Sequence, residues 1–272
     1  MTISAAMVKE LRVKTGAGMM DCKKALTKSE GDIDAAVKFL REKGLSVASK
    51  KADREANEGR VFSIINKEGQ LGVIVEVNCE TDFVANSEPF LELGNKLSNI
   101  SMADVSIKAA EDLSNIEIEN KSFKEFLAEY VLKVGENISI KRLNKVNSSG
   151  QLFTYIHMNG KIGVLLEFNQ PVDDSLGQDI SMHIAAASPS YLAMSDIDQS
   201  EIDKEKEIMK NHALNEGKPE KIIDRIVEGK IAKYCKEICL LEQVFVKDSD
   251  KTIKQILPAG IEILSFQRYA LG

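Results

Sequence analysis

The chain has 272 residues, of which 43% are hydrophobic and 29% are charged, and its formal net charge is −6. This composition is typical of a soluble globular protein with room for two or three small domains. An acidic protein is not expected to bind nucleic acid in general, because such binding needs a positive face that neutralises phosphates. The apolar runs are only strand-length, so no membrane span is expected. The N-terminus has no signal or transit pattern, which predicts a cytoplasmic protein.

Three short helices are predicted in residues 1–45. Ser4 is a plausible N-cap for the first helix, and the two glycines of "TGAG" interrupt the chain after it. Asp32 can cap the third helix, and Gly44 is expected to end it. These signals predict a compact three-helix module. The charged and weakly periodic segment that follows, 46–58, is expected to be a helical or flexible linker.

The chain contains an internal repeat of two hairpins. "GRVFSIINKEGQLGVIVEVN" from Gly59 aligns without a gap with "GQLFTYIHMNGKIGVLLEFN" from Gly150. Each copy has two apolar runs around a turn that contains glycine, which is typical of a β-hairpin. A helix-like stretch follows each copy. We therefore predict an α+β fold with a duplicated core of small antiparallel sheets and packed helices, with an N-subdomain at 59–148 and a C-subdomain at 149–194 and 242–272.

Further elements are predicted around this core. Residues 122–134 are helix-like, and "GENISIKRLNKV" after them could add a strand to the second hairpin. "GIEILSFQRYAL" has alternating apolar residues, which predicts a last strand that returns to the second sheet. Residues 195–241 are helical on both sides of a break at Gly217–Pro219. They predict an inserted helical hairpin.

No catalytic, metal or cofactor site is predicted. The glycines of "TGAGMMD" follow a helix rather than a strand, and the lysine of a phosphate-binding loop is missing. Cys235 and Cys239 share a helical face, but no histidine lies at a zinc-type spacing from them. Packing can explain both His157 on the second hairpin and His183 in an alanine-rich stretch. The protein is therefore expected not to be an enzyme.

The stretch "VNCETDFVANSEPF" places Phe83 in an expected surface turn. Thr81 can cap a short helical turn that holds Asp82 and Phe83 at its tip. Phe83 either folds back beneath the hairpin and helix or forms a rigid wedge for a partner's crevice, as aromatic interface anchors often do. The second copy has "QPVDDS" where the first has "CETDFV", so the shared architecture does not require the aromatic residue. We therefore favour a role outside that architecture.

Three motifs resemble those of a known family. The chain carries "VKELRVKTGAGMMDCKKAL" from Val8, "EVNCETDFVA" from Glu76 and "KVGENI" from Lys133, and it resembles the elongation factor Ts family over essentially its full length. The resemblance implies a ubiquitin-associated-like (UBA-like) N-terminal domain, a core of two related subdomains and a helical hairpin known as the dimerisation domain. It also implies a guanine nucleotide exchange factor that binds elongation factor Tu, GDP-bound and nucleotide-free, without itself binding nucleotide. Because the hairpin carries more charge than its inward face needs, we hypothesise that it self-associates into a homodimer.

The resemblance also implies which residues contact elongation factor Tu. Asp82 and Phe83 would form a wedge that enters the partner's GTPase domain near its Mg²⁺ site, with Val84 in support and Thr81 as the cap. The other implied contacts are Arg12, Met19, Met20, Lys23, Val134, Gly135 and His157. Core packing is the alternative for the two methionines. Asp179 stands where some relatives have a histidine, so the contacts of that helix are less transferable.

Two other functions fit parts of the sequence. The N-terminal module alone would suit an adaptor or scaffold that binds ubiquitin-like proteins, and capture of elongation factor Tu compared with ubiquitin would separate the two functions. A metal-dependent enzyme that uses Cys235, Cys239 and His212 would contain stoichiometric metal after purification. The exchange-factor function is the main prediction.

Overall fold

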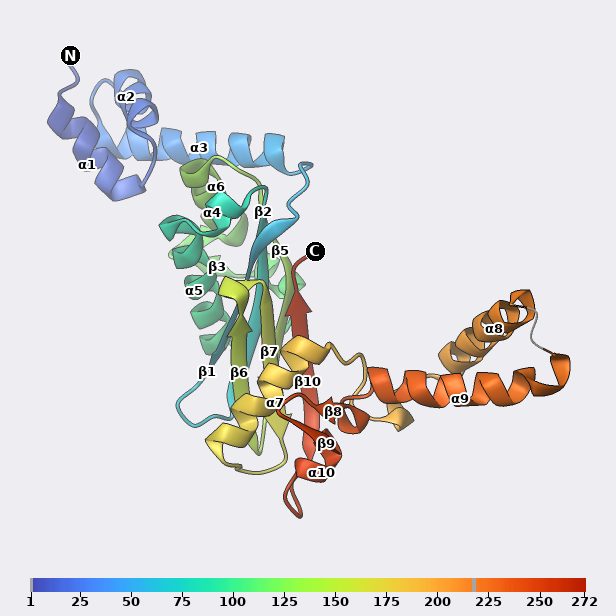
Figure 1. Ribbon diagram of the computed structural model, residues 1–272. Coiled ribbons are helices and arrows are strands. Elements are labelled where there is room, and N and C mark those ends of the chain that lie inside the picture. Colours follow the sequence, from blue (N-terminus) through green and yellow to red (C-terminus); the bar gives the residue numbers. More distant parts are fainter. Residues whose placement is uncertain (1, 217–218) are drawn as a thin grey trace. The chain divides into compact units, whose positions relative to one another are not determined.

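The computed structural model describes residues 2–216 and 219–272 (Figure 1). The chain divides into two compact units. The first contains the chain up to Asn147 with Ile156–Gly163 and Tyr269–Gly272, and the second contains Ser148–Tyr155 and Val164–Arg268. Both units combine helices with strands of small sheets. The predicted α+β class is therefore confirmed.

The N-terminal module has three helices, as predicted. They are α1 (Ala5–Thr15), α2 (Met19–Lys28) and α3 (Ile33–Lys51). The side chains of Ser4 and Asp32 accept hydrogen bonds from backbone N–H groups in the first turns of α1 and α3, at 3.3 and 3.0 Å. Gly16 follows α1 with φ +67°, a conformation that glycine adopts readily. The helices enclose a core of their own, which includes Val8, Leu11, Cys22, Leu26 and Leu40.

The predicted end of the third helix at Gly44 is wrong. α3 continues to Lys51 and runs beside α6 (Phe123–Val134) (Figure 1). A Cβ at Gly44 would lie 3.2 Å from the carbonyl oxygen of Ala128 on α6. Glycine at this position therefore allows two helices to approach closely rather than ending one of them. Beyond it, Val47 packs against the core of the first unit, so part of the predicted linker belongs to α3.

The first sheet lies in the first unit. Its antiparallel strands are β1 (Glu58–Ile65), β2 (Leu71–Cys79) and β5 (Ile138–Asn147), in that order. Val75 and Val77 of β2 contribute to a core that also includes side chains of α5 (Glu88–Ala103) and α6. The expectation that "GENISIKRLNKV" joins the second hairpin is wrong, because it forms β5 and pairs with β2. A hairpin leaves one edge of its second strand unpaired, and β5 satisfies that edge of β2.

Short elements complete the first unit. They are α4 (Asp82–Ala85), the 3-10 helices η1 (Ala110–Asn115) and η2 (Met158–Gly160), and the strands β3 (Glu117–Ile118) and β4 (Lys121–Ser122). α6 begins as predicted after Ser122, which forms a capping box with Glu125. Because this cap satisfies orphan N–H groups at the helix start, it fixes where α6 begins.

The second sheet has the strand order β10 (Ile263–Ala270), β7 (Ile162–Phe168) and β6 (Gln151–His157). The predicted last strand is therefore present and joins the second hairpin. α7 (Asp174–Ala187) follows β7 and packs on Phe153 of β6. A Cβ at Gly177 on α7 would lie 2.4 Å from the ring of Phe153, so the helix and the strand are in close contact.

The two hairpins repeat the same packing contacts. Gly94 on α5 lies against Phe62 as Gly177 lies against Phe153, and a Cβ at Gly94 would be 2.1 Å from the ring of Phe62. The hydroxyl groups of Ser63 and Thr154, at aligned positions, donate to carbonyl oxygens across their hairpins at 3.1 and 3.2 Å. The internal repeat seen in the sequence is therefore also a repeat of side-chain packing.

The helical hairpin consists of α8 (Gln199–Asn215) and α9 (Glu220–Ile238), which contact each other. Its buried cluster includes Ala213, Ile223, Val227, Ile231 and Cys235. Of the predicted Gly217–Pro219 break, residues 217 and 218 lie outside the described residues. The remaining elements of the second unit are η3 (Met194–Asp196), η4 (Leu240–Glu242), β8 (Val244–Phe245), β9 (Asp248–Thr252) and α10 (Ile253–Ile256). No helix in the described part of the chain has the length and apolar character to span a bilayer.

Candidate protein-binding site

Phe83 lies on α4, the four-residue helix after β2, with 81% of its surface exposed. The alternative in which Phe83 folds back beneath the hairpin is therefore wrong. Thr81 is the N-cap of α4, as predicted, and its Oγ1 accepts a hydrogen bond from Val84 N–H at 3.3 Å. Asp82 is exposed beside Phe83, whereas Val84 and Ala85 are buried in the core. α4 thus anchors one side in the protein and presents Asp82 and Phe83, here called the tip, to solvent.

Hydrogen bonds tie the backbone on both sides of the tip. Burial raises the pKa of the Cys79 thiol to about 12, so the thiol keeps its proton and donates to the Thr81 carbonyl oxygen at 3.1 Å. After the tip, Asn86 Nδ2 donates to the carbonyl oxygen of Asp82 at 2.6 Å. The hydroxyl of Ser87 donates to the last turn of α4 at 2.7 Å. A tip held in this way loses little conformational freedom when it binds a partner.

The "KVGENI" motif lies beside the tip, at the end of α6. Gly135 follows α6 with φ +77°, and its carbonyl oxygen accepts a hydrogen bond from Lys51. Val134 is half-buried against the core of the first unit. The next two residues, Glu136 and Asn137, exchange hydrogen bonds with the loop before α4. The structure therefore brings this motif and the tip together through residues that sequence reasoning missed.

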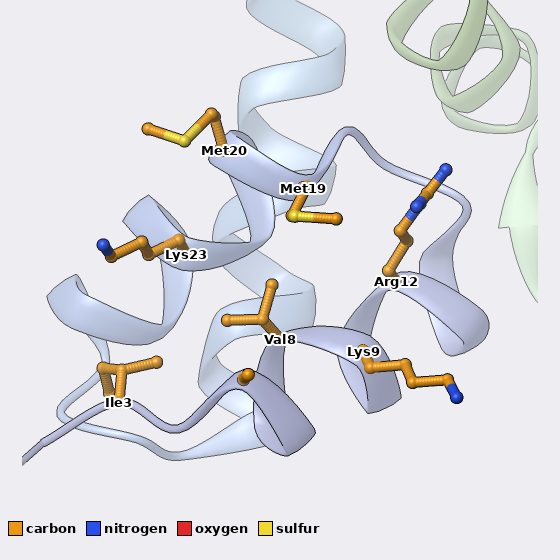
Figure 2. A pocket seen from close by; sticks show the side chains of 8 residues that line it. Ile3, Val8, Lys9, Arg12, Met19, Met20 and Lys23 are labelled. Carbon is orange, nitrogen blue, oxygen red and sulfur yellow. The ribbon is translucent and has the colours of Figure 1, made fainter.

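A second candidate surface is a hollow of about 680 Å³ on α1 and α2. Its lining residues are Ile3, Ala5, Val8, Lys9, Arg12, Met19, Met20 and Lys23. Met19 and Met20 are 60% and 63% exposed, so their alternative role as core filler is wrong. Figure 2 shows the cationic side chains of Arg12 and Lys23 on either side of Val8 and Met19. The four residues of the N-terminal module that the resemblance singled out thus line one hollow.

The N-terminal module is basic although the whole chain is acidic. Residues 1–51 contain eleven Lys and Arg and six Asp and Glu, a formal charge of +5, whereas the chain as a whole carries −6. Three of these cations line the hollow beside its apolar residues. Complementary charge across an interface steers a partner to its site. The hollow therefore matches a protein surface that combines apolar and acidic side chains.

His157 lies at the exposed end of β6, next to Met158, which is 64% exposed. Met158 and Asn159 have φ values of +49° and +54°, which residues other than glycine adopt uncommonly. His157 belongs to the segment Ile156–Gly163 of the first unit. Every residue that the resemblance singled out as a contact with elongation factor Tu therefore lies in that unit.

His183 is a buried residue of the second unit, and packing explains it, as one alternative predicted. Its Nδ1 accepts a hydrogen bond from Val246 N–H at 3.3 Å, and its Nε2 lies 2.9 Å from Oε1 of Gln243. Because Nδ1 is an acceptor, Nε2 carries the proton and donates to Gln243. Burial lowers the pKa of the ring, which stays neutral.

The candidate metal ligands do not form a cluster. Cys235 and Cys239 are buried free thiols. His212 Nδ1 lies 3.3 Å from Oε1 of Glu216, the C-cap residue of α8. Within residues 2–216 and 219–272, no group of three or more His, Cys, Asp or Glu side chains could hold a metal ion. The surfaces that the structure does offer, the tip and the hollow, are of the kind that contact other proteins.

Sequence reasoning missed part of both surfaces. Lys9 lines the hollow and lies three residues before Arg12, so helical spacing could have placed it on the same face. Ile3 precedes α1 and had no such signal. Glu136 contacts the loop of Thr81 from 55 positions along the chain, and no local pattern marks a contact at that separation.

Comparisons with known proteins agree with these observations. A family model described as "Elongation factor TS" matches residues 80–272. Elongation factor Ts of Clostridium acetobutylicum is 47% identical, over 99% of this chain and 92% of that protein. The Halothermothrix orenii protein of the same name is 48% identical, over 100% and 93%, and that of Clostridium perfringens is 45% identical, over 99% and 93%. On these matches, the chain belongs to the elongation factor Ts family.

Proposed function

We propose that this protein is a guanine nucleotide exchange factor for elongation factor Tu. Membership of the elongation factor Ts family supports a role in translation elongation. In this proposal the protein binds elongation factor Tu in its GDP-bound and nucleotide-free states, promotes release of GDP and allows GTP to enter. It acts by binding alone, in the cytoplasm, and contacts no nucleotide itself.

The observation that carries the proposal is the exposure of Phe83 on a helical turn whose backbone is tied on both sides. Aromatic side chains are common anchors of protein interfaces, because they bury a large area with few rotatable bonds. Phe83 is 81% exposed, and its neighbour Val84 is buried and holds the turn in place. The aligned position in the second copy is Asp174, at the start of α7. The aromatic residue thus serves no need that the two copies share.

The proposed mechanism is a wedge that disturbs the partner's magnesium site. Asp82 and Phe83 would enter a crevice of the partner's GTPase domain, with Phe83 filling it and Asp82 as its polar neighbour. Mg²⁺ requires near-ideal octahedral geometry at about 2.0–2.1 Å, so a small displacement of its ligands weakens its hold on the phosphates. If the factor weakens GDP binding, GDP weakens factor binding by the same ratio. This mutual antagonism makes exchange of the nucleotide faster without any bond being made or broken.

The hollow on the N-terminal module provides a second proposed contact. Arg12 and Lys23 would meet acidic side chains of the partner, and Met19 and Met20 would adapt to its apolar surface. This contact would hold the partner while the tip acts on the nucleotide site. Val134, Gly135 and His157 are proposed as smaller contacts.

The helical hairpin of α8 and α9 is proposed to form a homodimer. Ile208 and Leu214 on α8 and Ile222 on α9 are exposed apolar residues, at 59%, 42% and 45%. Burial of such side chains between two copies would be favourable. Sedimentation over a range of concentrations tests this, and a monomer that does not change with concentration would contradict it.

Phe83→Ala tests the proposed function. We expect the variant to fold normally and to lose most of the stimulation of GDP release, by a factor of about 30 or more, because hot-spot residues contribute about 2 kcal/mol or more. Stopped-flow release of a fluorescent GDP from elongation factor Tu measures this rate.

The matched control is Val105→Ala, which removes another exposed apolar side chain of the first unit, 84% exposed and located after the C-terminal end of α5. It should stimulate release as well as the unchanged protein does. A Phe83→Ala protein with full stimulation would exclude the wedge.

A further inference from the structure

Two carboxylates exchange hydrogen bonds between the loop before α4 and the loop after α6. Glu136 Oε2 accepts from the N–H groups of Glu80 and Thr81, at 3.1 and 3.0 Å, and its Oε1 accepts from the Thr81 hydroxyl at 2.7 Å. In return, the carboxylate of Glu80 accepts from Asn137 N–H at 2.7 Å and from Arg54 at 3.4 Å. These contacts lower the pKa of the Glu80 carboxyl group, and the hydrogen bond from Asn137 N–H is the largest cause. We call this set of bonds the carboxylate clasp.

The base of the clasp is itself held from several sides. Gly135, with φ +77°, turns the chain at the end of α6. Lys51 donates to the Gly135 carbonyl oxygen. Asn137 is buried, and its Nδ2 donates to the carbonyl oxygens of Ala52 and Arg54 at 3.3 and 2.8 Å. The position of Glu136 is therefore fixed by the end of α6 and by the chain that follows α3.

Beside its two bonds to backbone N–H groups, Glu136 is linked to α4 through the side chain of Thr81. The Thr81 hydroxyl donates its proton to Glu136, which leaves its oxygen lone pairs to accept from Val84 N–H at 3.3 Å. That second bond is the N-cap of α4. A helix of four residues has little stability of its own and depends on its cap and on its buried side. The orientation of Phe83 thus depends on a path from Glu136 to Thr81 to α4.

The second copy of the repeat lacks the means to form this clasp. At the positions of Glu80 and Thr81 it has Pro171, which has no N–H group, and Val172, which has no hydroxyl. The same copy lacks the exposed aromatic residue. The first copy of the repeat therefore has both the clasp and the aromatic tip, and the second copy has neither.

We propose that Glu136 is the positioning residue of Phe83. This inference rests on the proposed function and adds the residue that sets the geometry of the wedge. Glu136 does not contact the partner. It holds α4 so that the Phe83 ring is oriented before elongation factor Tu binds, and binding energy is not used to order the tip.

The test compares three variants in GDP release from elongation factor Tu at saturating factor. Glu136→Ala removes all three bonds, and we expect the maximal rate to fall about tenfold or more, since a misplacement of about 1 Å costs up to ~10²-fold. Glu136→Gln keeps an amide oxygen for the two N–H groups and has an NH2 group that can donate to the Thr81 hydroxyl oxygen, so it should retain most of the rate. Thr81→Val, which places the residue of the second copy in the first, should slow release as Glu136→Ala does. If Glu136→Ala does not fold, Thr81→Val serves as the test in its place.

Glu125→Ala is the matched control for stability. Glu125 accepts from the N–H and hydroxyl of Ser122 at 3.0 and 2.9 Å and from Arg41 at 3.1 Å, in the same unit but at the start of α6. Its loss removes a comparable set of bonds. We expect a similar loss of thermal stability with an unchanged maximal release rate. An equal slowing in Glu125→Ala would mean that the effect is only structural and would overturn the inference.

Two further measurements separate positioning from direct contact. Hydrogen exchange of the amides in residues 79–86 should become faster in Glu136→Ala. The double variant of Phe83→Ala with Glu136→Ala should release GDP at the rate of Phe83→Ala alone. The inference would be overturned if the effects of the two substitutions were additive or if amide exchange were unchanged in Glu136→Ala. It would also be overturned if Glu136→Ala stimulated release as fast as the unchanged protein. Full stimulation by Phe83→Ala would instead exclude the wedge, and failure of the unchanged protein to stimulate GDP release would overturn the proposed function itself, so the failures are distinguishable.

Discussion

Phe83 places an aromatic ring in solvent at a position where folding gains little from it. The ring is 81% exposed, so it contributes little to the burial of apolar surface. Surface substitutions of this kind usually change the free energy of unfolding by no more than about 0.5 kcal/mol. The activity of Phe83 variants can therefore be measured in a protein of nearly unchanged stability. This distinguishes Phe83 from Val84 beside it, which is buried in the core.

We expect His183 to make the stability of the second unit depend on pH. Burial lowers the pKa of the His183 ring in the folded state. A proton on Nδ1 would also lie against the N–H group of Val246, which now donates to that nitrogen. The folded state then binds fewer protons than the unfolded state. The contribution of His183 is therefore complete above the unfolded pKa of about 6.5, and it decreases as the pH falls towards the folded pKa. We expect a slope of at most about 1.4 kcal/mol per pH unit in this window.

Urea unfolding of His183→Gln between pH 8 and pH 5 measures this effect. The variant should be less stable at pH 8, because it leaves contacts to Gln243 and Val246 incomplete, and it should lose less stability on acidification. His212→Gln is the control, because His212 is exposed on α8. An equal pH dependence in the unchanged protein and in His183→Gln would show that other groups are responsible.

At the scale of helices and strands, the two hairpins depend on a glycine that lies over an aromatic ring. A Cβ at Gly94 or Gly177 would lie 2.1 or 2.4 Å from the ring of Phe62 or Phe153. We expect Gly94→Ala and Gly177→Ala each to lower the free energy of unfolding by about 1–3 kcal/mol, because the helix and the strand must move apart. Chemical denaturation followed by circular dichroism measures the loss.

The control for these substitutions is Gly229, which lies in the middle of α9 with no neighbouring atom within 4 Å of an added Cβ. Gly229→Ala should stabilise the helix by about 0.5–1 kcal/mol, because alanine has the higher helix propensity. If Gly94→Ala were as well tolerated as Gly229→Ala, close packing of α5 on β1 would not be the reason for glycine at that position.

At the scale of the whole molecule, charge is divided unequally along the chain. The N-terminal module carries a formal charge of +5 within a protein of −6. We expect association with elongation factor Tu to slow as salt is added, because the positive charge of this module would steer an acidic partner surface only at low salt. Replacement of Lys9, Arg12 and Lys23 by Gln should lower the association rate by about tenfold and weaken its salt dependence, with less change in the dissociation rate.

A control with the same change in net charge separates local from overall electrostatics. Lys204, Lys206 and Lys210 are exposed on α8 in the second unit, and their replacement by Gln also removes three positive charges. Stopped-flow association at several salt concentrations compares the two triple variants. Equal slowing in both would show that net charge, and not the hollow, determines the rate.

The parts of the fold that could be predicted are those that depend on neighbouring residues in the chain. The caps Ser4 and Asp32, both hairpins and the cap at Thr81 were predicted correctly, and each depends on bonds between residues close in the chain. Gly44 was interpreted wrongly because a glycine that ends a helix and a glycine that admits a second helix have the same local pattern. The neighbour α6, which distinguishes them, lies about 80 residues later in the chain.

The sequence by itself determined the α+β class, the duplication, the family resemblance and an exposed turn at Phe83, because helix caps, strand periodicity and repeats are local or comparative signals. Only the tertiary structure decided that β5 pairs with β2, that the methionines line an open hollow and that Glu136 holds the loop of Thr81. These contacts join residues far apart in the chain. Their geometry depends on the packing of whole elements, which no short stretch of sequence specifies.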